Sequence, residues 1–183
     1  MQQNKPSPRL PLDSCEALFE KLKWDYEQLS KEWSSYCTFN FVITAYHLYH
    51  DWIDRTGTKE QRKRKAKLPE NGQFLFKVWR DITNASKHWK LDRPSQDKQV
   101  VTAVSQPQIA DWYAYFVTGP VIYVQVGDAR PSLTQLADVT LLSFKWMIEG
   151  EESFLLSDLE RQLELVFPHH VINQLISVTE GNS

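Results

Sequence analysis

Residues 39–53, Phe-Asn-Phe-Val-Ile-Thr-Ala-Tyr-His-Leu-Tyr-His-Asp-Trp-Ile, decide the fold of this chain. Apolar side chains occupy nearly every side of a helix drawn through this stretch and its flanks, from 35 to 56. A helix that is apolar almost all round lies at the centre of a protein, where neighbours cover each face. Gly57 is placed to end it. The sequence therefore predicts a central helix over 35–56, packed on several sides by other helices.

The helices expected around this centre follow from the spacing of apolar residues and from capping signals. Before it, apolar residues from Cys15 to Trp33 recur at helical spacing, and Asp13 with Glu16 resembles a capping box, which predicts a helix over about 14–32. After it, a third helix is expected at about 70–89. Ser132 can cap a fourth helix with an apolar stripe from Leu133 to Ile148, and Ser157 a fifth at about 158–167.

The apolar period changes between the third and fourth helices. Short β-branched and aromatic segments at 100–104, 112–117 and 121–126 are separated by Pro107 and by Gly119-Pro120, a pattern typical of a small antiparallel meander. We therefore expect a mainly α fold: a bundle of four to five helices with a β insertion at 98–128, before the fourth helix. At 183 residues the chain is expected to form a single domain, with a loose leader at 1–11 and a frayed tail at 179–183.

Composition narrows the functional classes. The net charge of −2 argues against bulk attraction to nucleic acid or membranes, and no apolar run is long enough to span a bilayer. Cys15 and Cys37 lie in apolar helical patterns and are expected to be free thiols in a reducing compartment, so we expect a cytoplasmic protein without membrane contact. A basic segment at 59–68 holds six basic residues and one acidic; its ordinary interpretation is a solvated loop or helix end, and its alternative a phosphate-binding segment.

The end of the third helix is more polar than its packing requires. Arg80, Asn84 and Lys87 share one stripe there, and Asn84 also shares a stripe with Asp81 and His88. Arginine and lysine hold phosphate, and histidine moves protons near neutral pH. The ordinary interpretation is surface charge that complements the helix dipole, although a mid-helix Asn needs a compensating contact.

A second polar stripe follows the central helix. Its members are spaced four, three, four and three residues apart: Asn40, Thr44, His47, Asp51 and Asp54. It is either the wet side of that helix or a seam facing the third helix. In a seam, Asp51 orients His47 one turn away, and this pair approaches Asn84 and His88.

Two segments resemble a known family. Residues 41–52 and 81–88 resemble a group of bacterial proteins, and the second segment is similar to the signature of HEPN domains, helical bundles common in toxin–antitoxin and phage-defence systems. Asn84 and His88 fit the Asn-to-His spacing of that signature. Its arginine does not fit, since Thr83 stands at that position and Arg80 lies one turn earlier.

The resemblance implies a ribonuclease that needs neither metal nor cofactor and acts as a homodimer. His88 would be the general base on a ribose 2′-hydroxyl, Arg80 or Lys87 would hold the phosphate, and Asn84 would orient them, with His47 and Asp51 as possible partners from the second helix. Two alternatives remain. One is a catalytically silent module that binds a protein partner from the same operon. The other is a metal site built from His47, Asp51, Asp81 and His88.

Overall fold

The computed structural model describes residues 12–31, 34–88, 99–105, 122–150 and 154–173; within these ranges, the side chains of Ser35 and residues 86–88 are excepted. Helices dominate it, and a two-stranded antiparallel sheet accompanies them. The expected class, a mainly α bundle with a small β element before the fourth helix of the sequence prediction, is confirmed. The leader at 1–11, the tail at 179–183 and the segment 112–117 lie outside the described residues.

The first half of the chain forms the larger part of the bundle. Its elements are α1 (Cys15–Lys31), α2 (Ser35–His47), the π-helix η1 (Leu48–Trp52), α3 (Ile53–Thr56), α4 (Lys59–Ala66) and α5 (Glu70–His88). The helix expected over 35–56 is therefore present without a break as α2, η1 and α3. Its middle section, η1, is a wider π turn in place of a regular α-helical one. At the start of α1 the hydroxyl of Ser14, not the side chain of Asp13, accepts a hydrogen bond from the Ala17 amide, at 3.1 Å.

The second half adds strands and two further helices. Strand β1 (Ala103–Ser105) pairs with β2 (Tyr123–Gln125), and a turn at Gly127 brings the chain back along β2 to Ser132. Ser132 caps α7 (Leu133–Phe144), which continues as the π-helix η2 (Lys145–Glu149). Helix α8 (Leu156–Val166) follows, and its N-cap is Leu155 without a side-chain cap, so the capping role expected for Ser157 is wrong.

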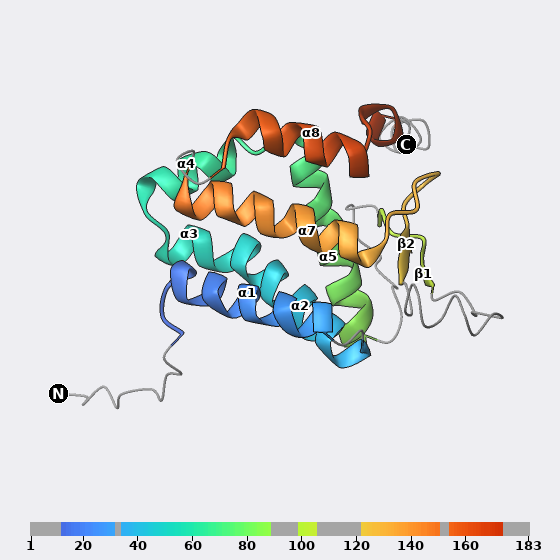
Figure 1. Cartoon of the computed structure of the whole chain (residues 1–183), viewed down its shortest axis with the longest axis horizontal. Helices are drawn as coiled ribbons and strands as arrows, with labels where there is room; N and C mark the ends of the chain where they lie inside the picture. The colour runs from blue at the N-terminus through green and yellow to red at the C-terminus, as the bar shows by residue number, and fades with distance from the viewer. Residues whose placement is uncertain (1–11, 32–33, 89–98, 106–121, 151–153, 174–183) are drawn as a thin grey trace.

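Figure 1 shows how these elements lie in space. Helices α1, α2, α7 and α8 run roughly parallel to the long axis and are stacked across it; α5 crosses them steeply, the strands lie at one end and α4 at the other. Fully buried aromatic side chains fill the interior, among them Phe41, Trp79, Phe144 and Trp146. The Trp79 indole donates a 2.7 Å hydrogen bond to the Thr140 hydroxyl and so joins α5 to α7. Within the described residues, none of the helices is long and apolar enough to cross a membrane.

The basic segment, expected as a solvated loop or helix end, is a short helix of its own. It forms α4, which begins with a capping box between Thr58 and Gln61. The Arg64 guanidinium donates hydrogen bonds of 2.8 and 3.1 Å to the carbonyls of Met147 and Ile148, at the end of η2. Arg64 thus supplies the donors that the last carbonyls of a helix lack, and α4 is fixed on the bundle.

Candidate functional site

The polar end of α5 is only partly described at the level of side chains. The α5 backbone reaches His88, so Arg80, Asn84, Lys87 and His88 lie on one helix as expected, but the side chains of residues 86–88 are not described. The Arg80 side chain is largely buried, and its Nε lies 3.5 Å from Oδ1 of Asp81. Asn84 is only 8% exposed. Within the described part of the chain, its amide nitrogen has no hydrogen-bond partner.

Asp81 holds the start of the β segment against α5. Its Oδ2 accepts hydrogen bonds from the main-chain amides of Val100, at 2.6 Å, and Val101, at 3.3 Å. A buried carboxylate that accepts main-chain amides is well satisfied without a metal. The described residues contain no group of three His, Cys, Asp or Glu side chains that could hold a metal ion. Oδ2 of Asp81 therefore serves the fold, and the alternative of a metal site built from His47, Asp51, Asp81 and His88 stays a prediction.

His47 and Asp51 form the pair that their spacing predicted. The His47 Nδ1 lies 2.9 Å from Oδ2 of Asp51, and both side chains are just over one third exposed. The hydrogen bond from His47 is the main cause that lowers the pKa of the Asp51 carboxyl, helped by the positive charges of His47 and Arg55. The Asp51 carboxylate of this pair therefore carries its negative charge more readily than a free carboxyl, and the pair is open to solvent.

The stripe on α2 does not form a continuous seam toward α5. The Thr44 hydroxyl is buried against α1, where it donates to Asp25 Oδ2 at 2.6 Å and accepts from Lys21 Nζ at 2.8 Å. At the far end of the stripe, Asp54 accepts a 2.6 Å hydrogen bond from Lys65 of α4. The seam interpretation is therefore wrong at these two positions, because the surrounding helices α1 and α4 cover different parts of the stripe.

The packing register of α2 on α5 separates His47 from His88. Thr38 and Phe39, at the start of α2, line one groove together with Ile82 and Ala85 of α5. His88 lies beyond Ala85 on α5, whereas His47 lies eight residues beyond Phe39 on α2, about 12 Å along that helix at 1.5 Å per residue. This register places the backbone positions of the two histidines far apart, which argues against a concavity that both share. Because the side chain of His88 is not described, the shared concavity stays a prediction.

His50 is the histidine that the sequence prediction missed. Its ring lies against that of Tyr46, with centroids 4.6 Å apart and ring planes tilted by 38°, and its buried Nε2 has no partner in the described part of the chain. Burial is the largest cause that lowers the pKa of His50. The nearby positive charges of Lys65 and Arg80 lower this pKa further, while a hydrogen bond to the Phe76 main chain and the charge of Asp51 raise it.

The π turn explains why His50 was missed. A π turn spans i to i+5, so it rotates later residues relative to a regular helix, and such turns often occur at functional sites. His50 lies within η1, and there its environment includes α5. The charges of Arg80 and Asp51, both candidates from the sequence, act on this imidazole. The spacing of residues alone carries no signal for this turn.

An apolar groove lies beside the polar end of α5. Its volume is about 550 Å³, and it is formed by α2, α5, β1 and the residues that flank β2. Phe39 and Val104 on its rim are exposed. The groove has the size of a small-ligand or peptide site.

Comparison with known proteins adds no assignment. No protein-family model, curated protein or solved structure matches the chain.

Proposed function

We propose that this chain is a HEPN-like protein that binds RNA and cleaves it without a metal ion, in a bacterial defence or toxin system. The observation that carries the proposal is Asn84. It lies on α5 one turn after Arg80 and one turn before His88, and it is buried with an amide nitrogen that has no partner among the described residues. A buried donor without a partner costs free energy in the folded protein, so its retention beside a histidine supports a role for it there.

In the proposed reaction His88 accepts the proton of a ribose 2′-hydroxyl. The 2′-oxygen then forms a bond to the adjacent phosphorus while the bond to the 5′-oxygen breaks, and the leaving oxygen takes a proton from solvent. The products are a 2′,3′-cyclic phosphate and a 5′-hydroxyl end. A general base and cationic groups that stabilise the phosphorane are sufficient for this chemistry.

Two cations on α5 are candidates for holding the phosphate. Arg80 lies eight residues before His88, which is about 12 Å along the helix, and its side chain is largely buried. In this proposal Arg80 or Lys87 holds the phosphate, as the resemblance implies. A homodimer, as the resemblance implies, would place a second α5 near the first.

The test is cleavage of end-labelled RNA in the presence of EDTA. We expect His88→Ala to reduce the rate about 10²- to 10⁴-fold, the usual cost of losing a general base. His170→Ala is the matched control, because His170 is an exposed histidine elsewhere on the chain. If the wild-type protein cleaves no RNA and His88→Ala lowers the melting temperature, His88 is a structural residue and the proposal fails.

The apolar groove favours a second candidate, a catalytically silent module that binds a protein partner encoded beside it. Its exposed rim residues Phe39 and Val104 would bury apolar surface of that partner. Co-expression with the neighbouring gene product tests this candidate. We expect Val104→Asp to abolish a stable complex, whereas a complex unaffected by this change would exclude the groove as its interface.

A further inference from the structure

Helix α4 is held on the bundle mainly by polar contacts from one face. Gln61 Nε2 donates hydrogen bonds to Glu16 Oε1, at 2.7 Å, and to the Ile148 carbonyl, at 3.3 Å. Arg64 binds the end of η2, as described above, and Lys65 pairs with Asp54 while lying over the Tyr49 ring. Residues 61, 64 and 65 cluster on one side of a helix with 100° per residue. This inner face, together with the capping box, fixes the orientation of α4.

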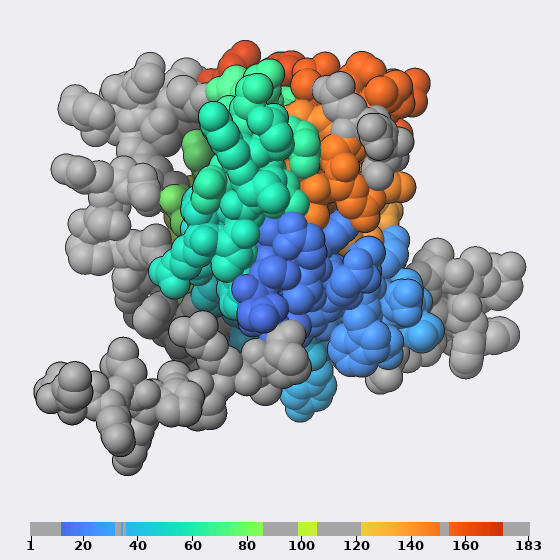
Figure 2. Space-filling model, turned by 90° about the vertical axis from the view of Figure 1, so that its left-hand side faces the viewer, coloured from blue at the N-terminus to red at the C-terminus, as the bar shows by residue number. Residues whose placement is uncertain are grey.

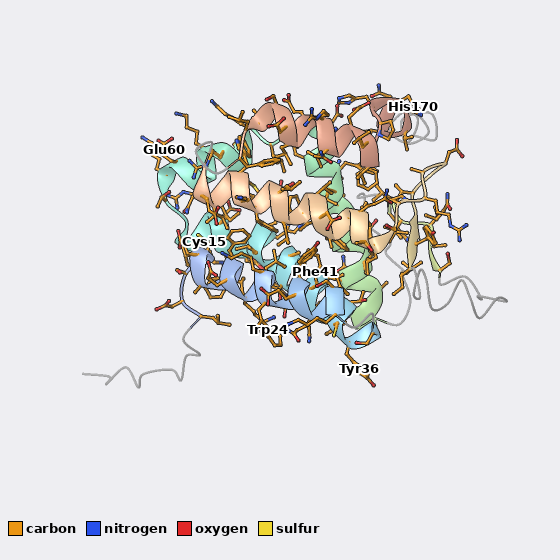
Figure 3. The ribbon with its side chains drawn as sticks, viewed as in Figure 1. Cys15, Trp24, Tyr36, Phe41, Glu60 and His170 are labelled. Atoms are coloured by element: carbon orange, nitrogen blue, oxygen red, sulfur yellow. The ribbon has the colours of Figure 1, made fainter. Side chains whose placement is uncertain are left out.

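The opposite face of α4 is positively charged and exposed. Lys59, Lys63 and Lys67 follow one another at four-residue intervals, so they form a stripe with about one helical turn between neighbours, and all three are exposed. Among the described residues, the one ion pair of these lysines joins Lys63 to Glu60, at 3.8 Å, on the solvent side. Arg62 adds a fourth exposed cation that donates to the Asp54 carbonyl. Figure 2 shows α4 on the face toward the viewer, and Figure 3 shows Glu60 at the outer end of the molecule.

The fold itself does not require this charge. The contacts that anchor α4 come from Gln61, Arg64 and Lys65, and an exposed lysine at 3.8 Å from a glutamate contributes little to stability. Like charges one turn apart on a helix repel each other, at a cost of a few tenths of a kcal/mol each. Lys63 and Lys67 complement the dipole at the C-terminal end of α4, but the described contacts that dock α4 on the bundle come from other side chains. The exposed stripe is therefore available to an anionic partner.

We propose that the outward lysine stripe of α4, defined by Lys59, Lys63 and Lys67, binds the phosphate backbone of RNA. This inference rests on the proposed function, and it adds a substrate-binding surface that lies outside the polar end of α5. The strand would contact the stripe through successive phosphates, because the three lysines recur at four-residue intervals along α4 and its C-cap. The contact would be independent of sequence and sensitive to salt.

RNA fits this surface better than a membrane does. Peripheral helices that bind anionic membranes insert large apolar side chains beside their cations. The outward face of α4 offers only Ala66 between its cations, and its apolar neighbours Ile53 and Leu68 are buried in the core. Because the net charge of the protein is −2, its surface as a whole does not attract a polyanion. The positive stripe is a local exception and would direct a polyanion to this part of the surface.

The experiment measures binding of a labelled 20-nucleotide single-stranded RNA with 2′-O-methyl riboses, which cannot undergo attack by a 2′-hydroxyl. The test variant is Lys59→Gln/Lys63→Gln/Lys67→Gln, since Gln preserves helix propensity. The matched control is Lys31→Gln/Lys77→Gln/Arg161→Gln, which removes the same charge from exposed positions on α1, α5 and α8. Affinities are measured from 50 to 200 mM salt, and circular dichroism checks that both variants fold.

We expect the test variant to bind at least tenfold more weakly at 50 mM salt, and the slope of log K against log salt to fall by about 2, or about 0.7 for each of three lost contacts. The control should bind like the wild type. If both variants lose the same RNA affinity, the loss reflects the change in net charge and not the position of the lysines, and the inference is overturned. Wild-type affinity in the test variant, or tighter binding to anionic vesicles than to RNA, would also overturn it while leaving cleavage at α5 standing. If the wild type binds no RNA at any salt, the proposed function fails with it.

Discussion

Replacement of Asp81 by Ala tests whether this residue holds the structure or serves a site. The carboxylate is buried and accepts two main-chain hydrogen bonds, from Val100 and Val101. Hydrogen bonds to a charged group contribute about 1.5–3 kcal/mol each, but Val100 is partly exposed and water can replace some of its bond. We therefore expect Asp81→Ala to lower the free energy of unfolding by roughly 3 kcal/mol. For a chain of this size, that corresponds to a melting temperature lower by roughly 6–12 °C.

The assay is urea denaturation combined with hydrogen exchange of single amides. In Asp81→Ala the amides of Val100 and Val101 should exchange much faster than in the wild type. The matched control is Glu160→Ala, an exposed carboxylate on α8, which should change stability by less than about 0.5 kcal/mol. Unchanged stability and unchanged exchange at Val100 and Val101 would refute the assigned role. Loss of RNA cleavage with no loss of stability would instead place Asp81 in the site.

Two further measurements concern buried titratable groups. Because the pKa of His50 is lowered in the folded protein, protonation favours unfolding, so stability should fall as the pH drops below 6.5, the ordinary value, toward the folded pKa. Urea denaturation at several pH values between 7.5 and 5 should show that His50→Gln flattens this dependence, whereas the same slope in wild type and variant would contradict it; His169→Gln, at an exposed position, is the control. Burial raises the pKa of the Cys15 thiol to about 11, so alkylation of Cys15 at pH 8 should be far slower in the folded protein than in urea, and rapid labelling of the native protein would refute this.

The helices were largely predictable because each carries its own periodic pattern. The apolar residues around Phe41 required burial on several sides, and the protein provides it from α1, α5 and the aromatic core. Figure 3 shows Phe41 within the bundle and Tyr36 of the same helix pointing away from it. The His47–Asp51 pair was predictable for the same reason, since residues four apart on a helix are neighbours whatever surrounds them.

The basic segment around Arg64 was not predictable as a docked helix. Its sequence lacks apolar periodicity, and the groups that hold it, the carbonyls of Met147 and Ile148, are more than eighty residues away in the chain. Local patterns contain no information about such distant acceptors. The same limit applies to Asp81, whose main-chain partners belong to the segment before β1.

The sequence by itself determined the main helices, the region in which β1 and β2 fall, and that polar residues gather on α5, because periodicity, capping and propensity act within a few residues. Only the tertiary structure decided which polar groups of different helices meet. Thr44 donates to Asp25 of α1, Asp54 accepts from Lys65 of α4, and His50 in the π turn η1 lies where the charge of Arg80 acts on it. The physical reason is that a buried polar group takes whichever partner the packed helices bring within hydrogen-bonding distance, and helix register sets that partner through contacts spread over the whole chain.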